Sequence, residues 1–365
     1  MNILFSGGGT GGHIIPALAI AEALRKKYPD AKIGFVSRSE GKENELIKRA
    51  GIPLYTIPIR GLERRFTMRN ISHVRQAIKA KSLAKDIIVQ FKADIIIGTG
   101  GYVCWPMISA GHELSVPTVM HESNAVPGLT TRLLSKKVNL LLLGTKNENI
   151  KKGVFVGNPI RGDFDKYTRA AARHSLGVGD TQQLIVSVGG SIGADRINST
   201  LLCVMQEYSL PEPDICHLHS TGHRYYEQFC ETMPQLCRGS CGVRAVPFIN
   251  DMPKVLAAAD LVISRCGAMT LSEIAYLGIP AILIPSPNAT GDHQMKNALY
   301  YQRHGAAEII PEKDLDADTL IKKIRELLSD GDRLKEMSES IKKLSVGNAK
   351  NEIAELIADT FFAED

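Results

Sequence analysis

The stretch Ser264–Glu273 combines a glycine turn, small side chains and one carboxylate where a predicted strand gives way to a helix. Gly267 allows a ligand to approach the backbone closely, and the first helical turn offers N–H groups and the positive end of the helix dipole to an anion. Glu273 supplies an acceptor that suits a sugar hydroxyl. These groups indicate a nucleotide-sugar site, although an ordinary strand–turn–helix with Glu273 as a solvated acid fits this stretch equally well.

Three further glycine-rich turns follow predicted strands. GGGTGG at 7–12 precedes a helix predicted over 14–27, GGSIGA at 189–194 precedes a second helix, and GTGGY spans 98–102. The first turn satisfies the G-x-G-x-x-G dinucleotide fingerprint, but Arg38 stands where that fingerprint expects an acid at the end of the next strand. A nicotinamide-dependent oxidoreductase is therefore the weakest interpretation.

Polar residues also follow several of the predicted strands. His121–Asn124 come after one strand, Asp292–Asn297 after another, and Asn158 and Arg161 lie between the two halves of the chain. Each of them taken alone suits a helix cap or a turn. Because the carboxyl ends of parallel strands meet at one edge of a sheet, their common position favours a shared ligand site.

Strands and helices alternate along the whole chain, which is typical of parallel sheets covered by helices on both faces. We expect strands at 1–6, 32–38, 52–59, 94–98, 117–120, 138–144 and 153–157, and then at 184–188, 215–220, 243–249, 260–264, 281–285 and 306–310. The helices expected among and after them include 14–27, 42–50, 70–91, 102–113, 127–136, 193–207, 316–329, 332–344 and 347–362. The sequence thus predicts an α/β protein with two doubly wound, Rossmann-like domains, residues 1–161 and 162–345, facing a cleft.

Charge is unevenly distributed over the 365 residues, although the net charge is only +5. Residues 1–161 contain 24 Lys and Arg against 11 Asp and Glu, whereas acids dominate the remainder. Much of the excess lies in 60–92, where apolar side chains are interleaved with basic ones. This pattern fits a solvated helix face or an anionic membrane surface, and neutralising Arg64, Arg65 and Arg69 should weaken membrane binding. We expect no nucleic-acid partner, because few aromatic residues and no nucleic-acid motif accompany the charge.

The cysteines and acidic pairs give little sign of a metal site. None of the seven cysteines forms a C-x-x-C pair, so we expect free thiols in a reducing compartment. The Cys and His residues of 216–241 lack paired ligand spacing, which disfavours zinc. Asp-x-Asp stretches at 163–165 and 314–318 fall at predicted helix starts, where capping explains them, so we expect no metal and no other cofactor. The N-terminus begins as a strand rather than a signal peptide, and no apolar run is long enough to span a membrane, which predicts a cytosolic protein.

Seven motifs, in the same order, resemble those of the MurG family of N-acetylglucosaminyltransferases in glycosyltransferase family 28. They are GGTGGH at 8–13, GGY at 100–102, HESN at 121–124, VGNPIR at 156–161, GGSIGA at 189–194, RCGAMT at 265–270 and SEI at 272–274. The similarity runs from residue 3 to about residue 310.

This resemblance implies a GT-B fold and an inverting transfer of N-acetylglucosamine from UDP-N-acetylglucosamine. The acceptor would be the 4-hydroxyl of the muramoyl sugar of lipid I (undecaprenyl-pyrophosphoryl-MurNAc-pentapeptide), and the product would be lipid II for peptidoglycan synthesis. Residues 1–161 would bind the acceptor and the membrane, residues 162–345 would bind the donor, and 346–365 would pack back on the first domain. The protein would lie peripherally on the cytoplasmic face of the bacterial inner membrane, with that anionic surface as a partner.

The motif positions also imply roles in catalysis. His13 would be the general base, since a neutral imidazole takes up a proton near physiological pH, and Glu122 is the alternative base. Displacement at the anomeric carbon requires stabilisation of the departing UDP. Ser191 with its loop amides, and the amides near Thr270, would stabilise that charge without a metal.

The remaining implied contacts concern binding of the two substrates. Ile249 would bind uracil through its backbone and Glu273 would bind the ribose. The other implied substrate-binding residues are Thr10, Gly11, Gly12, Tyr102, Asn124, Arg161, Ala268, Met269, Leu271, Ser272 and Gln294. Of these, Arg161 would lie near the nucleotide, and Gln294 and Asn124 would contact the donor sugar. His293 departs from the family pattern, in which many relatives carry a second amide beside the one at Gln294.

Two other classes of protein share this fold and stay open as alternatives. A UDP-N-acetylglucosamine 2-epimerase would not need a basic, apolar-studded acceptor face, and it would release free N-acetylmannosamine. A non-catalytic subunit of a lipid-linked glycan transferase often keeps one half-site, whereas both sets of motifs are intact here.

Overall fold

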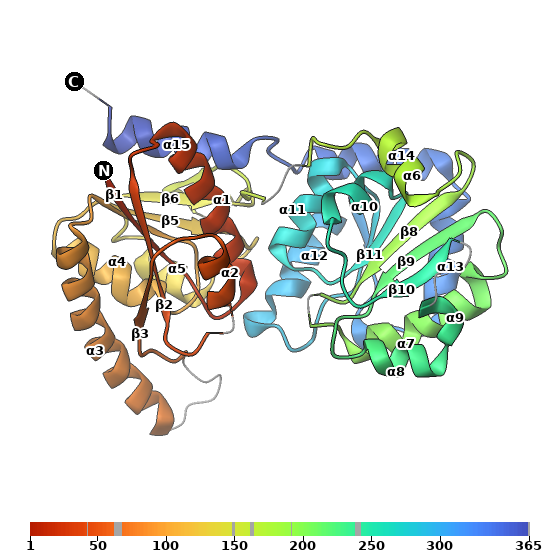
Figure 1. The fold of residues 1–365 in the computed structure, drawn as a ribbon, viewed down its shortest axis with the longest axis horizontal. Helices are drawn as coiled ribbons and strands as arrows, with labels where there is room; N and C mark the ends of the chain where they lie inside the picture. The colour runs from red at the N-terminus through yellow and green to blue at the C-terminus, as the bar shows by residue number, and fades with distance from the viewer. Residues whose placement is uncertain are drawn as a thin grey trace. The chain divides into compact units, whose positions relative to one another are not determined.

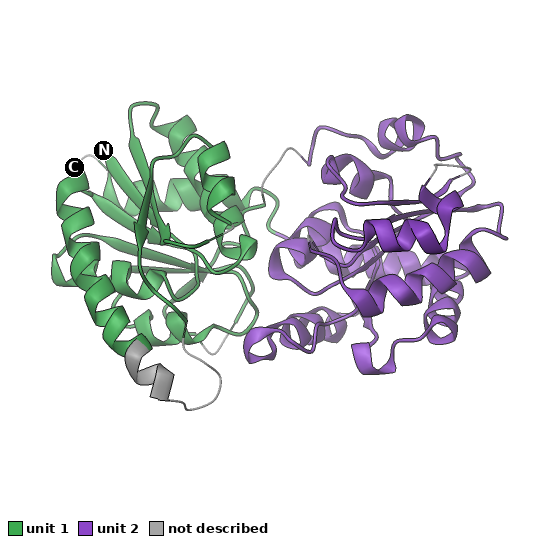
Figure 2. Cartoon of the chain, turned by 60° about the horizontal axis from the view of Figure 1, so that its bottom comes forward, with its two compact units in different colours: residues 1–161, 346–365 green, residues 162–345 purple. Residues whose placement is uncertain are grey.

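The computed structural model describes residues 1–41, 43–61, 68–147, 150–160, 164–190, 192–237 and 242–363, with the side chains of 68–72 excepted. The chain forms two compact units (Figure 2). Unit 1 comprises residues 1–161 together with 346–365, and unit 2 comprises residues 162–345. Each unit contains one parallel sheet with helices on both faces (Figure 1).

The sheet of unit 1 has seven strands in the order β3-β2-β1-β4-β5-β6-β7. They are β1 (Asn2–Ser6), β2 (Lys32–Arg38), β3 (Leu54–Ile57), β4 (Ile95–Gly98), β5 (Thr118–Glu122), β6 (Leu140–Leu143) and β7 (Gly153–Phe155). The helices are α1 (Gly11–Lys27), α2 (Asn44–Arg49), α3 (Met68–Phe91), α4 (Cys104–Glu113), α5 (Leu129–Leu134) and α15 (Ala349–Phe361). The order of strands reverses between β1 and β4, the position at which such sheets bind ligands.

Alternating side chains of β1 supply two separate hydrophobic cores. Ile3 and Phe5 pack with residues of α1 and with Ile353 and Ile357 of α15. Leu4 faces the other core, which includes residues of α3 and α4. The C-terminal helix therefore belongs to the core that the first strand begins, although all of unit 2 separates the two segments in the sequence.

The sheet of unit 2 has six strands in the order β10-β9-β8-β11-β12-β13. They are β8 (Gln183–Val188), β9 (Ile215–Ser220), β10 (Val243–Val246), β11 (Leu261–Ser264), β12 (Ala281–Leu283) and β13 (Ala307–Ile309). The helices are α6 (Arg169–Leu176), α7 (Asp195–Val204), η1 (Met205–Ser209), α8 (Tyr226–Thr232), α9 (Pro234–Cys237), α10 (Met252–Ala258), α11 (Ala268–Leu277), η2 (Thr290–Asp292), α12 (His293–Arg303), η3 (Glu312–Asp314), α13 (Ala317–Leu328) and α14 (Gly331–Lys342). Here the strand order reverses between β8 and β11.

The predicted α/β class with two doubly wound parallel sheets is confirmed, and most element boundaries fall within a few residues of those expected. Two ends differ. The helix predicted over 193–207 changes at Met205 into the π-helical turn η1. The strand predicted over 243–249 ends at Val246, because β9, its neighbour in the sheet, ends at the paired residue Ser220.

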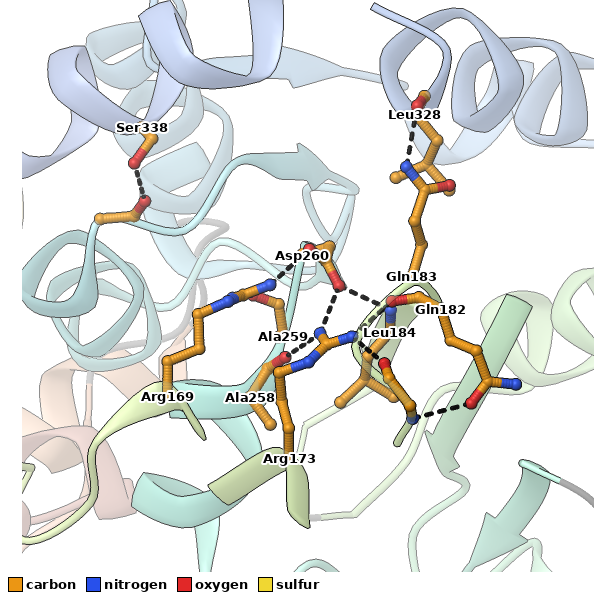
Figure 3. A network of polar contacts seen from close by, with 12 residues as sticks. Arg169, Arg173, Gln182, Gln183, Leu184, Ala258, Ala259, Asp260, Leu328 and Ser338 are labelled. Carbon is orange, nitrogen blue, oxygen red and sulfur yellow. Dashed lines mark hydrogen bonds and ion pairs between the residues drawn. The ribbon is translucent and has the colours of Figure 1, made fainter. Parts of the chain in front are cut away.

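A buried polar network joins the amino-terminal ends of β8 and β11 (Figure 3). The Arg173 guanidinium, which is almost fully buried, lies 3.0 Å from Asp260 and donates to the carbonyl oxygens of Gly179, Gln182 and Ala258. Asp260 also accepts a hydrogen bond from the Leu184 backbone N–H at 2.7 Å and pairs with the more exposed Arg169. The network therefore fixes the edge of the sheet opposite the glycine-rich turns.

The expectation that all cysteines are free thiols is wrong for one pair. Cys230 and Cys237 form a disulfide, with their Cα atoms 5.6 Å apart. The two cysteines are seven residues apart in the sequence and lie on either side of the break between α8 and α9. Among the residues that the structure describes, Cys104, Cys203, Cys216 and Cys266 are free.

Candidate functional site

The turn after β1 holds His13 at the start of α1. Nδ1 of His13 lies 2.9 Å from the carbonyl oxygen of Gly8. Because a carbonyl only accepts, Nδ1 carries the proton of the neutral ring and the lone pair resides on Nε2. A Cβ on Gly100 would lie 3.2 Å from Nε2, and one on Gly101 would lie 2.1 Å from the Gly8 carbonyl oxygen. These two glycines, with φ of 107° and 83°, therefore allow the two turns and the imidazole to meet.

A carboxylate at the N-cap of α2 braces the same turn. Oε1 of Glu43 accepts from the Gly9 backbone N–H at 2.7 Å and from Nε of Arg38 at 3.0 Å. Burial opposes ionisation of Glu43, but the hydrogen bonds from Arg38 and from backbone N–H groups hold its pKa below the usual range. Arg38, which breaks the dinucleotide fingerprint, thus serves to support the turn. Glu43 was not predicted from the sequence, because a lone acid after β2 gives no signal for this role.

Glu122, the alternative base, is engaged by four donors. Oε1 accepts from the backbone N–H and side-chain amide of Asn124, both at 3.0 Å. Oε2 accepts from the Gly128 backbone N–H at 2.9 Å and from the Thr131 hydroxyl at 2.5 Å. These contacts organise the loop between β5 and α5, and they also set the orientation of Asn124. Which of His13 and Glu122 takes up a proton stays a prediction.

The other predicted residues of unit 1 surround His13. Thr10 is the N-cap of α1, and Gly11 and Gly12 form its first turn. The Tyr102 ring lies against the turn, where a Cβ on Gly9 would come within 3.3 Å of it. Thr10, Gly11, Gly12, His13 and Tyr102 therefore gather at the β1–β4 switch point.

In unit 2, Gln294 links the loops that follow β11 and β12. Its Oε1 accepts from the backbone N–H groups of Cys266 at 3.3 Å and Ser286 at 2.9 Å. Arg265 supports the same loops by donating to the Ile284 carbonyl oxygen and pairing with Glu312 of η3. These bonds hold in place the loop that precedes α11, which carries the predicted contacts Ala268, Met269, Thr270, Leu271, Ser272 and Glu273.

The helices that start after three of the glycine-rich turns have no side-chain N-cap, a property they share with α4, α5 and α12. The N-caps Thr10 of α1, Ala194 of α7 and Gly267 of α11 make no side-chain hydrogen bond to their first turns. By contrast, the side chains of Asp251 and Asp316 cap α10 and α13, which confirms the capping role expected for Asp316. The first-turn amides of α7 and α11 therefore remain available to an anion such as a diphosphate.

The carboxyl group of Glu273 lies on the second turn of α11 and is partly buried. Burial raises its pKa to about 7. A carboxylate in such a setting gains from hydrogen bonds donated by a ligand, because they restore the solvation that burial removes. This environment fits an acceptor for ribose hydroxyls.

The loop after β10 carries Ile249, which is buried, directly after Phe248, which is 41% exposed. The Phe248 ring stacks on His223 from the loop after β9, with an interplanar angle of 12°. Phe248 was not predicted as a site residue, because an aromatic residue at the end of a predicted strand is expected in the core. Arg161 and Ser191 lie outside the described residues.

The histidines that raised the question of zinc are held by serines. His217 and His219 both contact the Ser187 hydroxyl, at 2.8 Å and 2.9 Å. Across the described ranges, no group of three or more His, Cys, Asp or Glu side chains has the arrangement of a metal site.

Residues 3–142 match the glycosyltransferase family 28 N-terminal domain, and residues 184–356 match the glycosyltransferase family 28 C-terminal domain. The chain is 41% identical to a protein of Caldanaerobacter subterraneus subsp. tengcongensis over 363 residues, which cover 98% of this chain and 99% of that one. That relative is named UDP-N-acetylglucosamine--N-acetylmuramyl-(pentapeptide) pyrophosphoryl-undecaprenol N-acetylglucosamine transferase.

Solved structures show the same relationship. The crystal structure of Acinetobacter baumannii MurG has a TM-score of 0.80 at 29% identity, covering 98% of this chain and 99% of that one. A UDP-N-acetylglucosamine 2-epimerase has a TM-score of 0.65 at 13% identity, covering 100% and 97%, which shows a shared fold alone. The two parallel-sheet units match the GT-B fold, and the chain belongs to the MurG family of N-acetylglucosaminyltransferases within glycosyltransferase family 28.

Proposed function

We propose that this protein transfers N-acetylglucosamine from UDP-N-acetylglucosamine to the 4-hydroxyl of the muramoyl sugar of lipid I, forming lipid II for peptidoglycan synthesis. The observation that carries the proposal is the similarity over 98% of the chain to a relative named for this transfer. No described feature favours the epimerase or a non-catalytic subunit.

In this reaction unit 1 binds the acceptor and unit 2 binds the donor. Nε2 of His13 takes the proton of the 4-hydroxyl as its oxygen attacks the anomeric carbon, and the bond from that carbon to UDP breaks with inversion. The amides at the starts of α7 and α11, with Ser191, stabilise the departing diphosphate. For the nucleotide, Glu273 accepts hydrogen bonds from the ribose hydroxyls, and Ile249 and Phe248 bind the uracil. Arg161 lies near the nucleotide. Gln294 and Asn124 contact the N-acetylglucosamine of the donor.

The proposal is tested with labelled UDP-N-acetylglucosamine and a short-chain lipid I analogue. We expect labelled disaccharide product, and equal rates with and without EDTA. Tight donor binding without transfer to this acceptor, or release of N-acetylmannosamine, would contradict the proposed reaction.

Donor binding should depend on pH through Glu273. Ribose hydroxyls donate to the charged carboxylate, so binding lowers a pKa that burial raises to about 7 in the free protein. Affinity for uridine should therefore be highest above pH 7 and fall below it, by at most about tenfold per pH unit. Uridine is the appropriate ligand because it lacks phosphates that titrate in the same range. Calorimetric titration between pH 6 and 8 measures this trend.

Glu273→Gln is the matched control for that titration. It keeps the size of the side chain but has no proton to lose, so its affinity for uridine should be the same across the range. A wild-type affinity that does not change with pH, or a variant that keeps the full trend, would remove Glu273 from ribose binding.

We also propose that unit 1 attaches to the anionic cytoplasmic face of the inner membrane through α3. The apolar side chains of Val74, Ile78 and Val89 on this helix are 49%, 60% and 63% exposed. They are interleaved with the basic residues Arg75 and Lys79. Part of the basic charge is compensated, because Lys85 lies 2.8 Å from Glu113 and Lys81 also pairs with it. Those lysines hold the pKa of Glu113 at about 2.

Attachment in this form would be peripheral. None of the helices in the described residues is both long and apolar enough to cross a bilayer. The residues Arg64, Arg65 and Arg69 that the charge pattern singled out lie outside the residues whose side chains are described. The test is therefore designed on α3 itself.

Replacing Ile78 with aspartate should weaken binding to vesicles that contain anionic lipid, because it removes an apolar contact and adds a repelled charge. Sedimentation with vesicles at low and high salt measures the effect, and wild-type binding should decrease as salt rises. Leu210→Asp, at an exposed apolar residue of unit 2, is the control and should bind like wild type. Equal binding by Ile78→Asp and wild type would exclude this face of α3.

A further inference from the structure

Five buried polar side chains of unit 2 are linked in series by hydrogen bonds, which form a chain of contacts. Ser209, His217, Ser187, His219 and Asn198 are all at least 95% buried, and each contacts the next. Successive distances are 2.8 Å from Ser209 to Nδ1 of His217, 2.8 Å from its Nε2 to Ser187, 2.9 Å from Ser187 to Nδ1 of His219, and 3.1 Å from its Nε2 to Oδ1 of Asn198.

The chemistry of the last partner gives this chain a single direction. Nδ2 of Asn198 donates to the carbonyl oxygen of Thr221 at 2.9 Å, so its Oδ1 must accept from Nε2–H of His219. Nδ1 of His219 then accepts from Ser187, whose oxygen accepts from Nε2–H of His217. Nδ1 of that ring accepts from Ser209. Each of the two serine hydroxyls and each of the two imidazole rings thus donates one hydrogen bond, and all of these bonds point toward the Thr221 end of the network.

This arrangement requires both rings to be neutral. Burial lowers the pKa of His217 to about 3 and that of His219 to about 4, so neither ring carries a charge near neutral pH. The carbonyl oxygen of Ser187 also lies 3.2 Å from Nδ1 of His219. A proton added there would be donated to that carbonyl and would interrupt the chain.

The chain ends on the backbone that supports the glycine-rich turn at 189–194. A Cβ on Gly193 would lie 2.1 Å from the Thr221 carbonyl oxygen, and one on Gly222 would lie 2.5 Å from the Gly193 nitrogen. Gly190, Gly193 and Gly222 all have φ between 80° and 93°. The Thr221–Gly222 backbone and the turn are therefore in direct contact, and a shift of the first displaces the second.

We propose that Asn198 is a positioning residue for the nucleotide diphosphate: it holds Thr221–Gly222 against the backbone of Ile192 and Gly193, and so keeps the backbone that leads into α7 in place for the anion. This inference rests on the proposed function, in which the turn at 189–194 and the start of α7 bind the diphosphate of the donor. Asn198 touches no substrate and acts only through the Thr221 carbonyl.

Asn198→Asp tests the role, because a carboxylate still accepts from His219 but cannot donate to Thr221. Calorimetric titrations of UDP and of uridine are compared, since only UDP contains the diphosphate. We expect UDP affinity to fall about tenfold, the equivalent of one lost hydrogen bond, while uridine affinity is unchanged. Equal losses for the two ligands, or none for either, would overturn the proposal.

Two further variants keep the test decisive. Ile197→Val removes one methylene from the fully buried neighbour of Asn198 on α7, and it should leave the ratio of UDP to uridine affinity at the wild-type value. If Asn198→Asp does not fold, Ser187→Ala interrupts the chain without touching Asn198, and it should lower UDP affinity selectively but less. A nonselective loss in Ser187→Ala would overturn the role, whereas a wild-type protein that binds neither ligand would instead contradict the proposed function.

Discussion

Replacing His13 with alanine should lower kcat for transfer to the lipid I analogue by about 10²–10⁴-fold, the usual contribution of a general base. The reason lies in the ring's tautomer. The Gly8 carbonyl oxygen holds the proton on Nδ1, which leaves Nε2 as the basic nitrogen. KM for UDP-N-acetylglucosamine should be unchanged, because the donor is assigned to unit 2. Steady-state rates at saturating acceptor measure both constants.

Glu122→Gln is the contrasting variant for that experiment. Its amide cannot accept from all four donors that surround Glu122, so we expect a lower thermal midpoint but a much smaller loss of kcat than in His13→Ala. Full activity in His13→Ala would reject His13 as the base. A loss of kcat in Glu122→Gln as large as that expected for His13→Ala would transfer the role to Glu122.

Replacing Arg173 with methionine should destabilise unit 2 by about 3 kcal/mol, the lower end of the cost of removing one partner from a buried ion pair. Methionine fills much of the same space, so the loss reflects charge and hydrogen bonds rather than a cavity. The variant would leave the exposed Arg169 as the remaining ion-pair partner of Asp260, and it would remove one hydrogen-bond donor each from the carbonyl oxygens of Gly179 and Gln182. Scanning calorimetry of the full chain measures the effect.

Two internal controls accompany this prediction. Arg169→Ala removes the other partner of Asp260, but Arg169 is 49% exposed, and an exposed pair contributes at most about 1 kcal/mol. The single tryptophan, Trp105 on α4, reports on unit 1, so its fluorescence transition should be the same in all three proteins. Equal destabilisation by both substitutions would show that the buried guanidinium has no special role.

The fold could be predicted because it depends on local pattern. Alternation of apolar strands with helical segments predicted both parallel sheets, and glycine-rich turns marked the strand ends at both switch points. The boundary errors arose where a neighbouring strand or a change of helix type set the end, as at Val246 and Met205. Neither the length of the neighbouring strand nor the change of helix type can be read from the residues of the segment alone.

The partners within the site could not be predicted, because they join residues far apart in the sequence. Gly9 and Glu43 are separated by 34 residues, and Ser187 and His219 by 32. The clustering of His217 and His219 with nearby cysteines raised the question of zinc, which the lack of paired ligand spacing disfavoured. The register of β8 with β9, which pairs Ser187 with His219, supplies the serine that explains them instead. The roles of the individual site residues stay predictions for the experiments above.

The position of α15 has a consequence for synthesis on the ribosome. Its buried residues Ile353 and Ile357 complete the core begun by Ile3 and Phe5, and Lys27 and Glu22 of α1 form ion pairs with Glu355 and Lys350. Unit 2 is continuous in the chain, so its whole sequence emerges before unit 1 has its last helix. Unit 1, whose strands are all translated before unit 2, is therefore completed only after unit 2, and until then the core face that α15 covers stays unfilled.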